Sequence, residues 1–355
     1  QTLAQGINTR SQAITAQSQA AQDDIVNCVN TINATLSTIG SLSNQIIQAQ
    51  AAGSSTADLE NQRQSEINTL SQYLSINVLP QTNGDVLITT SSGQELPTRS
   101  TSGPLSTSGV TVGPTSYYPG GGLPAVTLNG QDVTAALTGG QLGADLSLRD
   151  SVLPTQQAAL DEFSANLASR FGDQGLALFT DETGKIPSLT EPYTQSGYVG
   201  FAATIQVNPM VQSTPSLVRD GTPSSNTTGA AGYNTVITNV LNATFGPAGP
   251  TPSTTGLGPA GNLNLGYNPP ATLQQFASDI SSSLANASGN ATNQEQTEQG
   301  VQTMLQSKLS SETGVSLDSE MSQMIALQNA YDANAHVLTT IQSMYAQLFQ
   351  IPTTL

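Results

Sequence analysis

Hydrophobic positions in the first 52 residues recur at alternating intervals of four and three, which is the spacing of one face of a long helix. Gly53 ends this pattern. A capping box formed by Ser55 and Asp58 then predicts a second helix over 57–74. The apolar stripes of the two helices consist of Ile25, Val29, Ile32, Leu36, Ile39, Ser43 and Ile46 in the first, and of Leu59, Ile67, Leu70 and Leu74 in the second.

The pattern changes to that of β-structure after residue 75. Asn83–Gly84 and Asn129–Gly130 each lie between short β-rich runs, and Asn-Gly is a strong signal for a tight hairpin turn. Residues 76–138 are therefore predicted to form a small β-rich domain, with a Gly/Pro-rich excursion near 103–124.

Helical spacing returns over residues 141–171, where we expect Pro154 to kink the helix. Residues 173–270 are rich in Gly, Pro, Ser and Thr, which predicts a second β-rich region, separate from the first or continuous with it. Its expected strands are 176–180 (LALFT) and 201–207 (FAATIQV), with a turn at 181–185 (DETGK). The stripe of the 141–171 helix consists of Leu142, Leu146, Leu153, Leu160, Phe163, Leu167 and Phe171.

Two further helical segments complete the chain. Thr272 is the expected N-cap of a helix that runs to Ser311 with fraying near Gly289, and its buried face is Leu273, Phe276, Ile280 and Leu284. The last segment, Gly314–Phe349, has apolar residues on two faces, more than one small domain needs, so we expect it to pack against other chains. The candidate packing residues are Leu317, Met321, Met324, Tyr331, Ala335, Leu338, Ile341, Met344, Tyr345, Leu348 and Phe349.

The predicted fold class is multidomain α+β. A long, coiled-coil-like helical bundle is formed by both chain ends and a middle helix, with β-rich domains inserted between them. The expected division is a helical bundle domain of 1–75 with 139–172 and 271–325, a β-rich domain 76–138, a second β-rich region 173–270, and a terminal packing helix 326–355.

Composition and charge exclude several classes of partner. Charged residues make up only 9% of the chain, and 8 basic against 24 acidic residues give a formal net charge of -16. Nucleic acid and anionic membrane surfaces both require clustered cations, so neither is an expected partner. No apolar run is long enough to span a bilayer. The chain starts at Gln1 inside a helical pattern, and we expect it to continue a longer protein.

No constellation of reactive side chains is evident. Cys28, the single cysteine, lies on an apolar helical face and is expected to be buried, while Asp23 and Asp24 point in different directions on a solvated face. His336 is the single histidine and has no nucleophile near it in sequence. We therefore expect no catalytic, metal or cofactor site and no enzymatic activity. A secreted polysaccharide-active enzyme would need two convergent carboxylates in a cleft.

Three stretches resemble one protein family. Gly314–Phe349 (GVSLDSEMSQMIALQNAYDANAHVLTTIQSMYAQLF) resembles the carboxyl-terminal signature of flagellar axial proteins. Gly139–Phe171 and Asp58–Leu96 resemble the central helix and a neighbouring stretch of the hook-associated protein located between hook and filament. Asn61 and Gln64 stand where that family usually has acidic residues around the position of Arg63, and the family's amino-terminal motif is absent.

The resemblance implies a structural junction protein of the bacterial flagellum, secreted through the flagellar export apparatus and extracellular. Its implied partners are copies of itself in a ring, the hook protein, a second hook-associated protein or filament subunits, and an export chaperone for the terminal helix. It implies no cofactor. A phage or surface fibre of similar low charge is the alternative class of structural protein.

Overall fold

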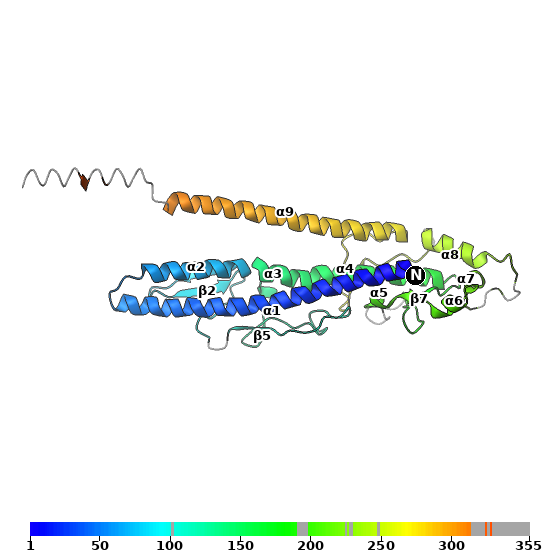
Figure 1. Ribbon diagram of the computed structural model, residues 1–355, viewed down its shortest axis with the longest axis horizontal. Coiled ribbons are helices and arrows are strands. Elements are labelled where there is room, and N and C mark those ends of the chain that lie inside the picture. Colours follow the sequence, from blue (N-terminus) through cyan, green and yellow to red (C-terminus); the bar gives the residue numbers. More distant parts are fainter. Residues whose placement is uncertain are drawn as a thin grey trace, which may run out of the picture. The chain divides into compact units, whose positions relative to one another are not determined.

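The computed structural model describes residues 1–100, 103–189, 198–223, 226, 230–246, 249–313, 324, 327 and 328. The chain divides into two compact units, Gln1–Leu284 and Ala285–Leu355. All described sheets belong to the first unit (Figure 1). Helices dominate and the sheets are small and antiparallel, which confirms the predicted α+β class.

The longest described element is helix α1, Thr2–Ala51. Its predicted seam is confirmed, because all seven positions from Ile25 to Ile46 are buried. The helix ends in a Schellman motif: the amide of Ser54 donates to the carbonyl of Ala49 and that of Gly53 to Gln50, with Gly53 at a φ of 69°.

Helix α2, Ala57–Tyr73, runs back along α1 (Figure 1). The predicted capping box is wrong, because Thr56 is the N-cap and its side chain makes no capping hydrogen bond. The Asp58 carboxylate instead accepts a hydrogen bond from Gln62 Nε2 at 2.9 Å, one turn further along the helix.

Both predicted hairpins are present. Strands β1 (Ile76–Pro80) and β2 (Val86–Thr90) pair antiparallel with Ile76 opposite Thr90. The second sheet has the order β3–β4–β5, with β3 at Leu105–Ser106, β4 at Thr127–Leu128 and β5 at Gln131–Asp132. Asn129 and Gly130 form its turn at φ values of 51° and 85°, which is the geometry that Asn-Gly favours. A 3-10 turn, Thr134–Ala136, follows.

The middle helix is interrupted. It comprises α3 (Gly140–Ser147), a π turn (Leu148–Val152) and α4 (Leu153–Gly172). We expected Pro154 to kink this helix, but the interruption is the π turn before it, in which the amide of Leu153 donates to the carbonyl of Leu148. Pro154 itself lies in the first turn of α4, where a proline is tolerated.

Residues 173–270 differ from the β-rich prediction, since helices alternate with short strands. The stretch 201–207, expected to be one strand, begins as helix α5 (Phe201–Thr204). The carboxylate of Asp161 caps this helix, because it accepts hydrogen bonds from the amides of Gly200 and Ala202, both at 2.9 Å. The turn at 181–185 is confirmed by the Asp181 side chain, which accepts from the amides of Thr183 and Lys185. The described elements are β6 (Phe179–Thr180), α5 (Phe201–Thr204), β7 (Gln206–Val207), α6 (Pro209–Ser213), α7 (Leu217–Asp220), α8 (Thr235–Phe245), β8 (Thr255–Leu257) and β9 (Leu263–Asn264).

Helix α9, Leu273–Thr313, begins in the first unit and continues into the second without a break at Gly289. The hydroxyl of Thr272 accepts a hydrogen bond from the amide of Gln275, which confirms the predicted N-cap. Leu273 and Phe276 are buried, but Leu284 is exposed.

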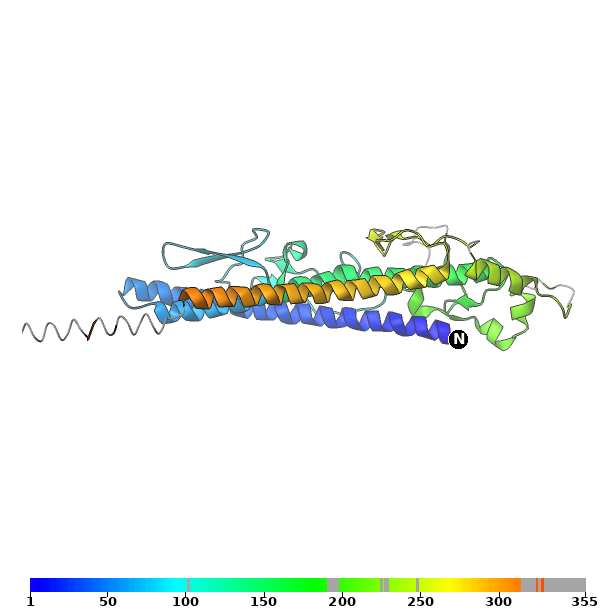
Figure 2. The same cartoon turned by 90° about the horizontal axis from the view of Figure 1, so that it is seen from above.

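The first unit contains two large hydrophobic cores along its length. The first joins α1, α2, α3 and the two sheets of residues 76–132, and the second joins the start of α1 to α4, α5 and the start of α9. A smaller cluster holds the inner face of α8 against Leu176 and Val211. Figure 2 shows α1, in blue, running along this unit. The proposed division of the chain into four parts stays a prediction.

Candidate functional site

Most of the predicted packing residues lie outside the described part of the chain. Met324 is described, and its side chain is 69% exposed. Val301, Met304 and Leu305 on α9 are also exposed. The second unit therefore presents apolar side chains to solvent within its described residues. The others, Leu317, Met321, Tyr331, Ala335, Leu338, Ile341, Met344, Tyr345, Leu348 and Phe349, are outside the described residues, as is His336.

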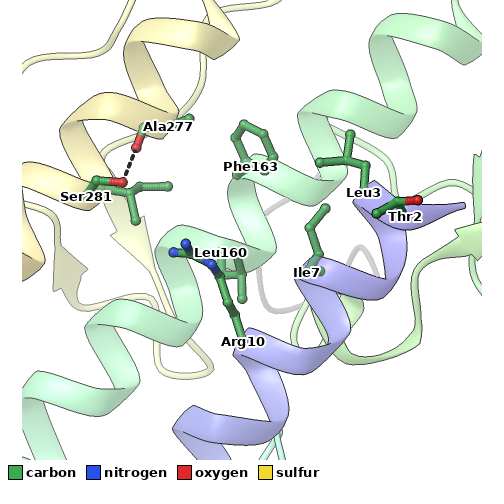
Figure 3. Close-up of a pocket in the computed structure, with 10 residues that line it drawn as sticks. Thr2, Leu3, Ile7, Arg10, Leu160, Phe163, Ala277 and Ser281 are labelled. Carbon is green, nitrogen blue, oxygen red and sulfur yellow. Dashed lines mark hydrogen bonds between the residues drawn. The ribbon is translucent and has the colours of Figure 1, made fainter.

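An apolar groove of about 430 Å³ lies in the first unit where α1, α4 and the first turns of α9 meet (Figure 3). Leu3 and Ile7 line it from α1, Leu160 and Phe163 from α4, and Ile280 from α9. Arg10 supplies the charged group among its lining residues. We refer to this feature as the α1–α4–α9 groove. Its volume is in the range that accommodates a ligand or several side chains of a partner.

Helix α8 exposes a second apolar surface. Val236 and Val240 face the small core, whereas Ile237, Leu241 and Phe245 are exposed at intervals of four residues. Leu241 is 52% and Phe245 67% exposed. We name these three residues the α8 stripe. The helix contains no charged residue, so the stripe has neither a salt bridge nor a charged rim of its own.

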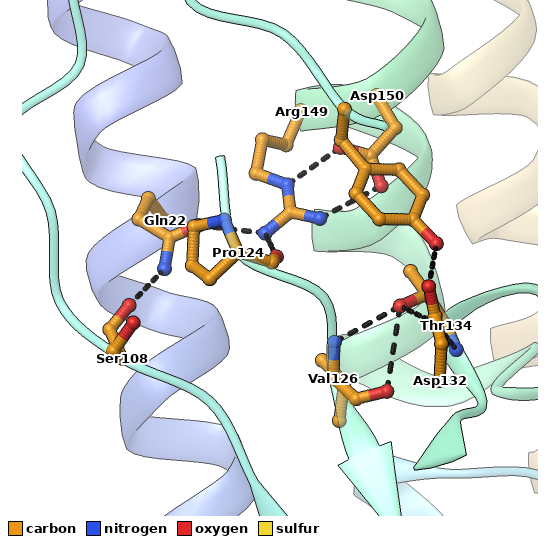
Figure 4. A network of polar contacts seen from close by, with 9 residues as sticks. Gln22, Ser108, Pro124, Val126, Asp132, Thr134, Arg149 and Asp150 are labelled. Carbon is orange, nitrogen blue, oxygen red and sulfur yellow. Dashed lines mark hydrogen bonds and ion pairs between the residues drawn. The ribbon is translucent and has the colours of Figure 1, made fainter. Parts of the chain in front are cut away.

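Arg149 fastens the loops of residues 103–126 to the helices (Figure 4). Its side chain is fully buried, binds both carboxylate oxygens of Asp150 at 2.6 and 2.9 Å, and donates to Gln22 Oε1 at 2.6 Å and to the carbonyl of Pro124 at 3.0 Å. Gln22 in turn donates to the carbonyl of Ser108. Burial raises the pKa of Asp150 despite the neighbouring guanidinium. The cluster is thus a structural clamp whose donors and acceptors are already satisfied by the protein.

The ring of Tyr118 covers this clamp. Its centroid lies 5.5 Å from the Arg149 Cζ atom, a cation–π distance, and its hydroxyl donates to Asp132 at 2.6 Å. That hydrogen bond, together with those from Thr134, lowers the pKa of Asp132, while burial is the main cause that raises the pKa of Tyr118. The β5 turn is therefore tied to the same arginine as the loops.

Arg170 performs a similar task at the other end of α4. It is fully buried and donates to the carbonyls of Ala243, at 3.0 Å, and Pro250, at 2.7 Å, with longer contacts to Thr244 and Gly246. Burial lowers its pKa. In the part of the chain that the structure describes, no carboxylate pairs with Arg170. Its positive charge is instead stabilised by the carbonyl end of α8, where the helix dipole is negative.

Glu162 is a buried acid in the second core. Its carboxylate accepts hydrogen bonds from the amide of Ser253 at 2.6 Å and from Asn166 at 2.9 Å, and it also bonds the hydroxyl of Tyr198. Burial raises the pKa of Glu162, and these hydrogen bonds offset part of that shift. Burial and the charge of Glu162 raise the pKa of Tyr198. The contacts with Ser253 and Tyr198 hold two loops to α4, whereas the contact with Asn166 lies within the helix.

Cys28 is buried, as predicted from its position on the apolar face of α1. Burial, and then the charges of Asp145 and Asp24, raise the pKa of its thiol to about 11. The thiol is therefore protonated at neutral pH. Asp23 and Asp24 are both exposed, which confirms the prediction of a solvated helix face.

The described residues hold neither a metal-binding cluster nor a membrane-spanning helix. Among them, no group of three or more His, Cys, Asp or Glu side chains is arranged to hold a metal ion. In that same part of the chain, no helix combines the length and the hydrophobicity needed to cross a bilayer.

Comparison with known proteins assigns both ends of the chain. Residues 1–185 match the family model described as the flagellar hook-associated protein FlgK helical domain. Residues 306–351 match the model described as the flagellar basal body rod FlgEFG protein C-terminal region. No curated protein matches the chain.

A solved structure, that of the flagellar hook junction protein FlgK from Burkholderia pseudomallei, is also similar. The two chains share 26% sequence identity with a TM-score of 0.40, and the similarity covers 53% of this chain and 34% of that one. This chain thus spans about a third of the length of that relative. The helical-domain match extends over 185 of 355 residues, more than half of the sequence. The chain belongs to the FlgK family of flagellar hook-associated proteins.

Proposed function

We propose that the chain is a structural protein of the junction between the flagellar hook and filament. The observation that carries this proposal is the match of residues 1–185 to the FlgK helical domain. In that region the long α1 seam, the α2 and α3 stripes and the two hairpins share one core, so the matched region includes a complete packed core. The FlgK relative from Burkholderia pseudomallei is itself described as a flagellar hook junction protein.

The proposed assembly element is the terminal segment, residues 317–349. Two findings support it: residues 306–351 match the C-terminal region of flagellar rod proteins, and Met324 and Leu327 are exposed apolar residues. A helix with two apolar faces gains most of its stability from tertiary partners, because isolated helices are marginal in water. Neighbouring copies in a polymer supply such partners on more than one side.

The proposed partners are further copies of the chain in a ring, the hook protein on one side, and a second hook-associated protein or filament subunits on the other. An export chaperone is proposed to cover the terminal segment before secretion, since exposed apolar helices associate non-specifically. The location follows from the family: the protein is part of the flagellum, and we propose that it lies outside the cell.

We further propose that the chain catalyses no reaction. The support comes from three buried charged side chains, each of which holds parts of the chain together. Arg149, Arg170 and Glu162 each bind backbone or side-chain partners rather than project into a cleft.

The test is a deletion of residues 326–355 in a cell that lacks the full-length protein. We expect the first unit to stay folded, measured by circular dichroism, while filaments fail to attach and filament subunits collect in the medium. Leu338→Asp should have nearly the same effect, because it places an unpaired charge on an apolar seam. Ser343→Asp, outside both seams, is the matched control and should support attachment.

Secretion of each variant is measured separately, because loss of export would also prevent assembly. The proposal is wrong if the truncated chain, or the Leu338→Asp variant, is secreted and still joins hook to filament.

A further inference from the structure

Helix α8, which carries the α8 stripe, lies at the end of the first unit where α1 and α9 begin (Figure 1). The first turns of α1 and α9 line the α1–α4–α9 groove, so the two surfaces lie at the same end of this unit. Both surfaces belong to the compact unit Gln1–Leu284. One surface is concave and the other is a ridge of three side chains on a helix. Two complementary surfaces at one level of a rod-like unit are suited to lateral contact between copies that stand side by side.

Their dimensions agree. Ile237 to Phe245 spans eight residues, or about 12 Å along a helix axis at 1.5 Å per residue. The part of α1 that lines the groove, Leu3 to Arg10, spans seven residues, or about 10 Å. Apolar anchors repeated at intervals of one turn are how an amphipathic helix fits a hydrophobic groove.

The charges of the two surfaces are also compatible. The chain has a net charge of -16, so most contacts between copies would bring like charges together. Among the residues that the structure describes, no acidic one lines the groove, and α8 has no charged residue. On α7, which packs beside α8, Arg219 and Asp220 neutralise each other. Docking at these surfaces therefore buries apolar area without desolvating a carboxylate of either surface.

We propose that the α8 stripe of one copy docks in the α1–α4–α9 groove of the next copy. This inference rests on the proposed assembly function and names the lateral interface. Since the two surfaces differ, the contact is heterologous, and repeating it around an axis generates a ring when the rotation closes. Leu241 and Phe245 act as anchors, and Leu3, Phe163 and Ile280 form their receptacle.

Salt dependence distinguishes this contact from an ionic one. Screening of the -16 charges on each copy weakens their repulsion, and an apolar contact keeps its own stabilisation in salt. Association is therefore expected to strengthen as NaCl rises, whereas a contact held by Arg10 and a carboxylate would weaken.

The experiment uses two full-length variants, Leu3→Cys and Leu241→Cys, mixed at about 1 mM, where contacts of weak affinity are populated. Both positions are about half exposed, and Cys28 is 2% exposed, so a short bis-maleimide reacts chiefly at the introduced thiols. We expect cross-linked dimers in the mixture and none in either variant alone. Leu79→Cys, on β1 and equally exposed at 50%, is the control and should cross-link with neither.

Adding Phe245→Asp to the Leu241→Cys chain should lower the yield about tenfold, because it places a charge in the apolar contact. The proposed interface is wrong if the mixture gives no more cross-linked product than the Leu79→Cys control. It is also wrong if Leu241→Cys cross-links with itself equally well, because this would indicate that α8 of one copy contacts α8 of the next. Either result leaves the deletion test of residues 326–355 unaffected, so the two proposals fail separately.

Discussion

Gly40 is the position where helix propensity and packing predict opposite effects. It lies in the middle of α1, is buried, and faces the backbone of Thr98. A Cβ atom at position 40 would stand 2.0 Å from the Thr98 carbonyl oxygen and 2.8 Å from its carbon. Alanine in place of glycine in a helix interior normally stabilises by about 1 kcal/mol.

The contact is expected to outweigh that gain. A carbon–oxygen contact needs about 3.3 Å, so the segment around Thr98 must move by more than about 1 Å. Leu96, two residues earlier, is buried and donates its amide to Ile88, and Arg99 pairs with Asp85, so the segment is anchored on both sides. Overpacking of this kind costs typically about 1–3 kcal/mol. Taking the upper part of that range and subtracting the gain in helix propensity, we expect Gly40→Ala to lower the free energy of unfolding by about 1–2 kcal/mol.

Urea unfolding followed by circular dichroism measures the change, with Gly6→Ala as the matched control. Gly6 is on the same helix, and no described atom outside the helix backbone lies within 4 Å of the place that its Cβ would occupy, so this variant should be more stable by up to about 1 kcal/mol. If Gly40→Ala stabilises the chain as Gly6→Ala does, the segment around Thr98 does not press on α1, and the reasoning fails.

Two further predictions concern the buried polar groups. Arg149→Met should destabilise the first unit by about 3–5 kcal/mol, because it leaves Asp150 without its cation, and should open residues 103–126 to protease. The control is Arg219→Met, which breaks a solvent-exposed Arg–Asp pair of the same geometry and should change the stability little. Equal losses of stability in the two variants would contradict the role of Arg149 as a clamp. Glu162→Gln should flatten the pH dependence of stability. The raised pKa of Glu162 means that the folded state binds more protons than the unfolded state above pH 4.5, so wild-type stability falls as pH rises from 4.5 to the folded pKa. The urea midpoint of unfolding is measured for both proteins at several pH values across that window. If it changes with pH equally in wild type and Glu162→Gln, Glu162 is not a buried carboxyl with a raised pKa.

The long elements were predictable from sequence because their signal is periodic. The apolar residues of the α1 seam recur at helical spacing over many turns, so each of them supports the same prediction. Asn-Gly favours the positive φ angles of a tight hairpin turn without help from distant residues. The α5 error has the opposite cause. Residues 201–204 read as a strand locally, but the carboxylate of Asp161, some 40 residues earlier, caps them as a helix. No local pattern contains a contact made over that distance.

The candidate surfaces were less predictable. Arg149 and Arg170 look like ordinary solvated helix residues, and only the fold shows that carbonyls from distant loops surround them. Arg170 does stand between Leu167 and Phe171 of the apolar stripe, which is a faint sign of burial. The α8 stripe lies in a stretch whose Gly, Pro, Ser and Thr content favours turns and loops, and this composition masks its helical spacing. The groove needs residues from three separate segments.

The π turn at Leu148–Val152 sets the angular phase between the two cores of the first unit. Leu142 and Leu146 before it belong to the first core, and Leu160 and Leu167 after it belong to the second. Each helical residue turns the chain by about 100°, so removing one residue here would rotate everything built on α4 relative to the hairpins. The α4 wall of the groove, Leu160 and Phe163, and the end of α8 held by Arg170 would turn together, whereas the α1 wall would stay with the first core. The number of residues between Leu146 and Leu153 therefore decides whether the α1 and α4 walls of the groove face each other.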